Sequence, residues 1–217
     1  MPDMEKTKKK EPQAPAKPIL ATTRLTQKLD HIVEAAGTQE GKWSEASLQA
    51  IDEIPQVPGV YCFVLDEKYL PKERMLILHG RSFGREGNRS QLQFRFHYTA
   101  SILKAGSGLV VYVGKASNLH GRMKGHLSTN VKSTTNQVLR GLAGKRSSEV
   151  SALELKAARK TLLENGKVFF FEHYHEDEKK EHGGRDDVGQ SLVAERDLLE
   201  IKLIAKYAPP FNLKAER

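Results

Sequence analysis

The sequence has a single cysteine and no long hydrophobic run. These two features argue against a disulfide-stabilised protein and against a membrane-spanning one. With only Cys62 present, no disulfide can form within the chain. This cysteine lies in the apolar run "GVYCFVL" with no basic neighbour, which favours a small buried residue over a reactive nucleophile. No apolar stretch approaches the roughly 20 residues that span a bilayer, and the chain starts without a secretory signal. The sequence therefore predicts a cytoplasmic protein with no membrane partner.

Positive charge is what the chain has in excess. Its 217 residues include 35 Lys and Arg against 27 Asp and Glu, which gives a formal net charge of +8. That balance favours a polyanionic partner, and nucleic acid is the first candidate. Residues 1–20 are rich in Lys, Pro and Ala and predict a disordered basic tail, which either adds nonspecific DNA affinity or only solubilises the protein.

Hydrophobic periodicity and breaker residues divide the remainder into helices and strands. An N-terminal helical extension is predicted over 21–54, with helices at 22–36 and 44–52, and Pro55 and Pro58 end it. An α+β fold with a small, mainly antiparallel sheet flanked by helices fits the order of the elements. The other predicted elements are strands at 59–65, 74–80, 109–114 and 167–173, and helices at 91–104, 117–128, 134–145, 149–164 and 191–208, the last capped by Ser191.

A basic stretch follows the strand at 109–114. Lys115 lies directly after Gly114, and Arg122 and His126 are four residues apart, so they share one face of a helix. A glycine lets the backbone approach a ligand closely, and arginine makes forked contacts with phosphate oxygens. A solvated basic face on a surface helix is the alternative interpretation.

Two further stretches, "GVY" on the strand at 59–65 and "LLEIKLIAKYAPPFN" near the C-terminus, extend this pattern. Together with "YVGKASNL" they resemble the GIY-YIG nuclease superfamily, and "IPQVPGVYCF" is similar to the catalytic domain of the UvrC excision-repair nuclease. The resemblance implies a nuclease domain over 55–217 with a three-stranded sheet and an insertion at about 66–108. The residues that match the superfamily's motifs are Tyr61, Tyr112, Gly114, Arg122, His126, Glu200 and Asn212.

The superfamily hydrolyses DNA phosphodiester bonds with one divalent metal ion, and the resemblance implies the same chemistry here. Glu200 would hold Mg²⁺ or Mn²⁺, one ion per active site, because hard cations prefer carboxylates. Arg122 would neutralise charge on the phosphate oxygens, and Tyr61 would position or deprotonate the attacking water. Since a free tyrosine has a pKa of about 10, this base needs a lowered pKa or a relay. The candidate relays are Tyr112, Lys115 and His126, and Asn212 is the asparagine that closes the domain.

Several of these residues also have a structural interpretation. Tyr61 and Tyr112 suit half-buried strand aromatics. Glu195 competes with Glu200 as the acidic ligand, although a position in the first turn of a helix suits a structural acid. Asn212 suits backbone hydrogen bonding near a helix end.

Two other segments imitate functional motifs. The segment "ILHGRS" partly matches the "YVG" strand, with His79 in place of the central residue and Arg81 at the position that corresponds to Lys115. His173 and His175 form a His-x-His pair of the kind that binds zinc, but the sequence places no third ligand beside them.

The insertion at 66–108 mixes arginines with aromatic residues, a combination that suits a nucleic-acid surface. A structural elaboration with solvated arginines is the alternative. The residues predicted to contact DNA are Arg81, Arg85, Arg89 and Arg95 of the insertion and Lys124 of the following helix.

Three functions are compatible with these features. The leading one is a free-standing, metal-dependent endonuclease that cuts double-stranded DNA at specific sites, as restriction enzymes do. Such enzymes usually act as homodimers on palindromic sites. A repair-type nickase similar to UvrC is the second function, and a DNA-binding module without catalysis is the third. Fold resemblance alone does not separate them.

Overall fold

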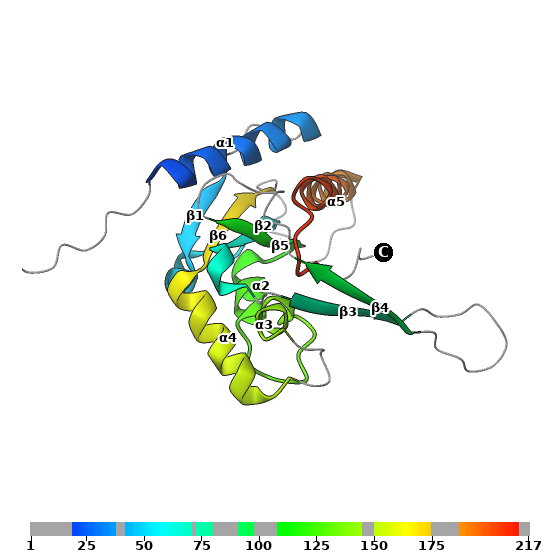
Figure 1. Ribbon diagram of the computed structural model, residues 1–217. Coiled ribbons are helices and arrows are strands. Elements are labelled where there is room, and N and C mark those ends of the chain that lie inside the picture. The colour runs from blue at the N-terminus through cyan, green and yellow to red at the C-terminus, as the bar shows by residue number, and fades with distance from the viewer. Residues whose placement is uncertain are drawn as a thin grey trace, which may run out of the picture.

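The computed structural model describes residues 19–37, 42–70, 73–79, 91–97, 108–144, 150–174 and 187–212. Its centre is a four-stranded antiparallel sheet with helices on both faces, which confirms the predicted α+β class (Figure 1). The helices are α1 (Ile19–Ala36), α2 (Leu119–His126), α3 (Gln137–Leu142), α4 (Ala152–Asn165) and α5 (Asp187–Tyr207), with 3₁₀ turns η1 (Leu48–Glu53) and η2 (Glu67–Tyr69). The strands are β1 (Ser44–Ser47), β2 (Gly59–Leu65), β3 (Glu73–His79), β4 (Gln91–His97), β5 (Leu109–Ala116) and β6 (Lys167–Glu172).

The central sheet has the strand order β1-β6-β2-β5, and each neighbouring pair is antiparallel. In β2, Tyr61 lies opposite Gly114 of β5 on one side and opposite Phe170 of β6 on the other. Phe63 lies opposite Tyr112, so the two tyrosines come from adjacent strands and belong to the same face. β5 forms an edge of this sheet, so the backbone groups on its outer side need partners other than a strand.

The fourth strand, β1, corrects two predictions. The sequence predicts a helix at 44–52 and a three-stranded sheet, but Ser44–Ser47 pairs with β6 and only the 3₁₀ turn η1 follows. A short isolated helix is marginal in water, whereas strand pairing satisfies the backbone groups along the edge of β6. Ser47 then caps η1 by accepting a hydrogen bond from the Gln49 N–H group. The N-terminal extension is therefore part helix and part sheet.

A separate two-stranded ribbon is formed by β3 and β4. The predicted helical spacing at 91–104 is wrong for the described part, which is strand β4. Leu92, Phe94 and Phe96 alternate with polar residues, and this period of two favours a strand once β3 offers a partner. In Figure 1 the β3–β4 ribbon extends away from the central sheet.

Alternating side chains of β2 divide the hydrophobic core into two layers. Tyr61, Phe63 and Leu65 pack with residues of α2, α3 and α4 on one face of the sheet. Val60 and Cys62 pack with α1 and α5 on the other face. Cys62 is fully buried, and burial raises the pKa of its thiol, so it is the small core residue that the sequence predicts.

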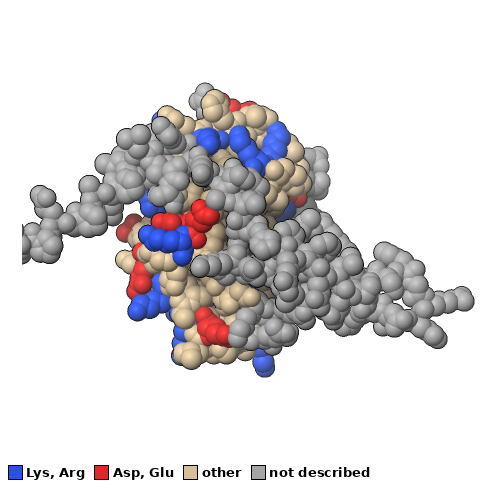
Figure 2. Space-filling view, viewed as in Figure 1, with Lys and Arg blue, Asp and Glu red and all other residues tan. Residues whose placement is uncertain are grey.

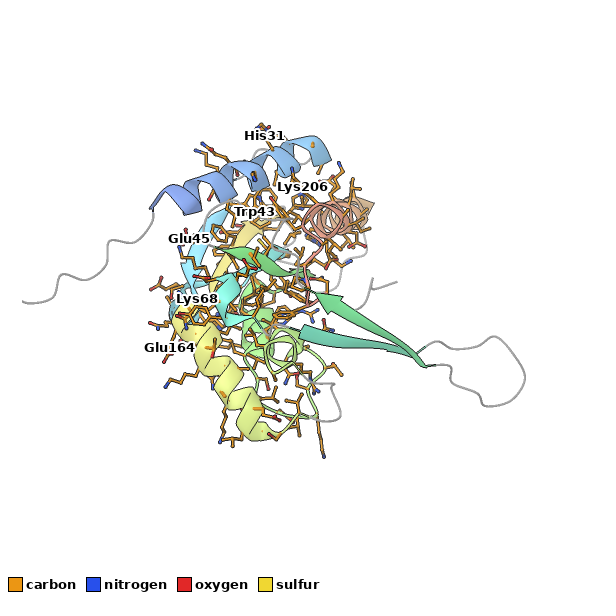
Figure 3. All side chains as sticks on the ribbon, viewed as in Figure 1. His31, Trp43, Glu45, Lys68, Glu164 and Lys206 are labelled. Atoms are coloured by element: carbon orange, nitrogen blue, oxygen red, sulfur yellow. The ribbon has the colours of Figure 1, made fainter. Side chains whose placement is uncertain are left out.

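The layer of α1 and α5 is fixed by contacts from distant parts of the chain. Figure 3 shows Trp43 in the space between α1 and the sheet. The Trp43 ring lies 5.9 Å from that of Phe171 on β6, and its backbone N–H donates to the Asp30 carboxylate at 3.5 Å. Lys202 of α5 donates to the Ala35 carbonyl oxygen near the end of α1 at 2.5 Å. The Trp43 contacts join α1 to the sheet, and the Lys202 hydrogen bond joins α5 to α1.

Capping residues mark the start of α4 but not that of α5. A capping box of Ser151 and Glu154 starts α4, and Gly166 ends it. Helix α5 begins at Asp187, upstream of the predicted cap Ser191, whose hydroxyl instead hydrogen-bonds Glu195 within the helix. Among the described residues, no helix combines the length and the apolar character needed to cross a membrane.

Candidate active site

Tyr61 and Gly114 face each other across β2 and β5. A methyl group on Gly114 would lie 2.5 Å from the Tyr61 hydroxyl oxygen, much closer than side-chain atoms normally approach. Glycine is therefore required sterically, because its missing side chain makes room for the tyrosine.

Tyr61, Tyr112 and His126 form a buried cluster between β2, β5 and α2. The Tyr61 hydroxyl lies 2.6 Å from Nε2 of His126, and the His126 ring centre lies 4.8 Å from that of Tyr112. Burial raises the pKa of Tyr61 well above its ordinary value, and Tyr112 adds to this effect. Tyr61 is thus a neutral phenol at pH 7. This is the opposite of the lowered pKa that a tyrosine base would need, so a relay is the remaining route.

His126 is buried and neutral. Burial, and then the positive charge of Arg122, lower the pKa of His126 to about 3. A neutral imidazole has one donor and one acceptor nitrogen, so its tautomer decides which partner donates in the bond to Tyr61. Its Nδ1 is buried and has no hydrogen-bond partner among the described residues, so the hydrogen bond of this ring to the described part of the chain is the one with Tyr61.

The lowered pKa of His126 predicts a fold that loses stability in acid. Below about pH 6.5 the unfolded chain protonates His126, whereas the folded protein does so only near pH 3. This contribution is therefore complete above pH 6.5 and is lost as the pH falls towards 3. From pH 7.5 to 5, the wild type should lose about 2 kcal/mol more unfolding free energy than His126→Gln in urea titrations. His31→Gln, at an exposed position of α1, should behave as the wild type. Equal losses for the wild type and His126→Gln would contradict a buried neutral histidine.

Arg122 lies on α2 one turn before His126, and its side chain is exposed. Its charge still reaches the buried pair, because it lowers the pKa of His126 and opposes the rise in the pKa of Tyr61. Lys124 on the same helix is instead paired with Asp52 at 3.1 Å. Arg122 is therefore the cation of α2 that is directed electrostatically at the buried cluster, and its guanidinium group suits a phosphate.

Lys115 follows Gly114 on β5 and contacts two carboxylates of α5. Its ammonium group hydrogen-bonds Asp197 and lies 3.6 Å from Oε2 of Glu200. Burial alone would lower the pKa of Lys115, but the hydrogen bond to Asp197 and the charge of Glu200 together raise it, so the amine stays charged.

Glu200 interacts with residues on both sides of the edge strand β5. Its side chain is 16% exposed, it forms the ion pair with Lys115, and its charge contributes to the raised pKa of Tyr61. Sequence reasoning assigned no role to Asp197, although its position three residues before Glu200 places both on one face of α5. That three-residue spacing was the feature of the sequence from which Asp197 could have been found.

Glu195, the competing acid, is engaged elsewhere. Its Oε2 lies 3.0 Å from Nε2 of the buried His173, and the neighbouring Arg196 donates to the His173 carbonyl oxygen at 2.7 Å. These contacts join α5 to the end of β6 and favour Glu200 as the metal ligand. His175 lies outside the described residues, and the described part of the chain holds no cluster of three His, Cys, Asp or Glu side chains that suits a metal.

Asn212 bonds the outer edge of β5. Its Oδ1 accepts from the Val113 N–H group at 2.8 Å, and its Nδ2 donates to the Val113 carbonyl oxygen at 2.7 Å. The Phe211 N–H group donates to the Val111 carbonyl oxygen at 3.0 Å. The chain after α5 therefore covers the unpaired edge of the sheet, which is the structural role that the sequence left open for this asparagine.

Asn212→Ala is expected to lower the unfolding free energy by about 1–3 kcal/mol, because it leaves the N–H and carbonyl groups of Val113 without their partner. Urea unfolding measures this change. Asn130→Ala is the control: its Oδ1 accepts from the Lys132 N–H group at 2.9 Å, but at an exposed position where water replaces the lost partner, so stability should fall by less than about 1 kcal/mol. Equal effects of the two substitutions would contradict the clamp on β5.

Of the competing motif "ILHGRS", only residues 77–79 are described, and they belong to β3. His79 ends β3, which pairs with β4, and it lies opposite Gln91. The glycine opposite Tyr61 is therefore Gly114. Arg81, Arg85 and Arg89 lie outside the described residues, whereas Arg95 lies on β4.

Comparison of the chain with models of known protein families, with curated proteins and with solved structures finds no match. The function is therefore inferred from the chemistry of the site.

Proposed function

We propose that this protein is a divalent-metal-dependent endonuclease of the GIY-YIG type that hydrolyses phosphodiester bonds in double-stranded DNA. The observation that carries the proposal is the environment of the Tyr61 hydroxyl. It lies 2.6 Å from the neutral His126 ring and in the fields of both Arg122 and Glu200. Hydrolysis of this kind needs a path for a proton, a cation for the phosphate and a carboxylate for a metal ion. His126, Arg122 and Glu200 would supply these in turn.

The arrangement of the sheet supports a GIY-YIG fold. Strands β6, β2 and β5 are adjacent and antiparallel, which suits the three strands expected of that fold. Tyr61 and Tyr112 come from neighbouring strands, and α2 supplies Arg122 and His126 beside them. On this proposal β1 is an addition at the far edge of the sheet.

Glu200 is the residue that we assign to the metal ion. Its carboxylate is partly exposed and already lies beside a cation, the ammonium group of Lys115. A single protein carboxylate together with water molecules is an ordinary set of ligands for Mg²⁺, and Mn²⁺ has the same preference for oxygen. When bound, the ion would stabilise the negative charge on the leaving oxygen.

The proton of the attacking water leaves through Tyr61. The hydroxyl oxygen of Tyr61 accepts that proton while its own proton passes to Nε2 of His126. In the free protein the charge of Arg122 helps to hold the pKa of His126 low. A phosphate bound to Arg122 would offset this charge, so His126 becomes a better proton acceptor when DNA is in place.

The β3–β4 ribbon supports a second contact with DNA, because a two-stranded ribbon fits the major groove. In the register of the ribbon, Gln91, Gln93 and Arg95 of β4 lie at alternate positions, opposite His79, Ile77 and Met75 of β3. Arginine and glutamine are the side chains that read guanine and adenine edges. Elsewhere, on the surface shown in Figure 2, acidic and basic side chains are interspersed. We therefore assign base contacts to these positions of the ribbon.

Arg95→Ala is expected to weaken binding to a duplex about tenfold and to leave its salt slope nearly unchanged, because a contact with a base edge neutralises no phosphate. Arg74→Ala is the matched control, because Arg74 lies on the same ribbon but opposite Phe96, outside these alternate positions. Fluorescence anisotropy at several salt concentrations measures both quantities. Equal effects of the two substitutions would contradict the assigned positions.

Incubation of the protein with supercoiled plasmid and Mg²⁺ tests the proposed reaction. Discrete linear fragments that disappear with EDTA would support a site-specific, restriction-type enzyme, and a homodimer is the form expected on a palindromic site. Nicked circles alone would favour the repair-type nickase. Binding without any cutting would contradict the proposal and favour a non-catalytic DNA-binding module.

A further inference from the structure

Asp197 has no part in the reaction described so far, yet it makes the closest contact on the carboxylate side of the site. Asp197 and Glu200 are three residues apart on α5, and both approach the ammonium group of Lys115 on β5. Lys115 donates a hydrogen bond to Asp197, whereas its 3.6 Å separation from Glu200 exceeds the usual length of an N–H···O bond. Asp197 therefore holds Lys115 more closely than Glu200 does.

Lys115 and a divalent metal ion would compete for Glu200. Both are cations, since the ammonium group of Lys115 forms ion pairs with the carboxylates of Asp197 and Glu200. If the ammonium group closed on Glu200, a metal ion would have to displace it. A second carboxylate that retains the ammonium group removes part of that barrier to metal binding.

We propose that Asp197 is a positioning residue that takes the hydrogen bond of the Lys115 ammonium group and so keeps Lys115 at ion-pair distance from Glu200, where a divalent metal ion can compete for this carboxylate. This inference rests on the proposed metal-dependent function. Asp197 acts through Lys115 and need not contact the metal itself. The side chains of Lys115 and Asp197 are 40% and 42% exposed, so both can be replaced without opening the hydrophobic core.

A double-mutant cycle on Mn²⁺ affinity tests the inference. Electron paramagnetic resonance of free Mn²⁺ gives the affinity of the full chain without DNA, for the wild type, Asp197→Asn, Lys115→Met and the double variant. Asp197→Asn should weaken Mn²⁺ binding about tenfold when Lys115 is present, but less than about twofold in the Lys115→Met background. The same factor in both backgrounds would show that Asp197 acts by its own charge or as a ligand, and would overturn the inference.

Glu200→Gln separates failure of this inference from failure of the proposed function. If the wild type binds Mn²⁺ no more tightly than Glu200→Gln does, the metal site is contradicted and the role of Asp197 falls with it. If Glu200→Gln loses Mn²⁺ but Asp197→Asn does not, only the positioning role is overturned.

Cleavage provides a second readout. Asp197→Asn should raise the Mg²⁺ concentration needed for half-maximal cleavage, while the rate at saturating Mg²⁺ stays close to that of the wild type. A lower rate at saturating Mg²⁺ with an unchanged half-maximal concentration would also overturn the inference. Thermal melting of each variant in EDTA confirms that it is folded.

Discussion

Tyr61→Phe is expected to lower the rate of DNA cleavage by about a hundredfold to ten-thousandfold, the usual contribution of a positioned proton-transfer group. Phenylalanine fills the same space between β2 and α2 but removes the hydroxyl that lies 2.6 Å from His126. The attacking water then loses its path for the proton, while Arg122 and Glu200 remain. Single-turnover cleavage of plasmid, with DNA affinity measured separately, should place the loss in the chemical step.

Tyr207→Phe is the matched control for this substitution. Tyr207 is also buried, in the layer of α1 and α5, and its hydroxyl has no hydrogen-bond partner among the described residues. The Tyr207→Phe variant should cleave DNA at the wild-type rate. Tyr61→Phe also leaves Nε2 of His126 unpaired, at a cost of about 1–3 kcal/mol, so the assay must run well below the melting temperature. A folded Tyr61→Phe protein with wild-type activity would contradict the proton path.

Glu200→Gln is expected to reduce Mg²⁺-dependent cleavage by at least about a thousandfold, because several kcal/mol of transition-state stabilisation by the metal ion are lost. Glutamine has nearly the same shape, but it removes the negative charge that binds the cation. The charge of Glu200 also acts on Tyr61 and pairs with Lys115, so the substitution changes both sides of β5. Cleavage rates over a range of Mg²⁺ concentrations measure the effect.

Glu195→Gln makes the same chemical change on the same helix. Glu195 pairs with His173 and lies outside the group formed by Lys115, Asp197 and Glu200. It should retain cleavage within about threefold of the wild type and lose at most about 1–3 kcal/mol of stability. If Glu195→Gln abolishes cleavage while Glu200→Gln retains it, the two acids have been assigned the wrong way round.

The sequence is informative wherever a residue type has one strong steric or periodic meaning. The run "GVYCFVL" predicts β2 with its bounds, because β-branched and aromatic residues fill a buried strand. Gly114 after an apolar strand predicts the close approach of a ligand, whereas in the structure the space beside it is taken by the Tyr61 side chain. The spacing of Arg122 and His126 predicts a shared helical face, and α2 carries both.

Other features depend on contacts that no local pattern contains. Strand β1 forms because β6 offers it an edge, and its own sequence favours no strand. The pKa of His126 falls because α2 buries it beside Tyr61 and Arg122, which the sequence spacing alone does not reveal. Asp197 gains its importance only when β5 brings Lys115 to α5.

The claim that residues on both sides of the edge strand β5 form one active site is tested most directly by combining two substitutions. Plasmid cleavage with saturating Mg²⁺ is measured for the wild type, Tyr61→Phe, Glu200→Gln and the double variant. Groups that act in one step give non-additive losses. We predict that the wild type cleaves and that each single variant cleaves much more slowly. The double variant should cleave no more slowly than the less active of the two single variants. Losses that multiply in the double variant, or a wild type that does not cleave, would contradict the account.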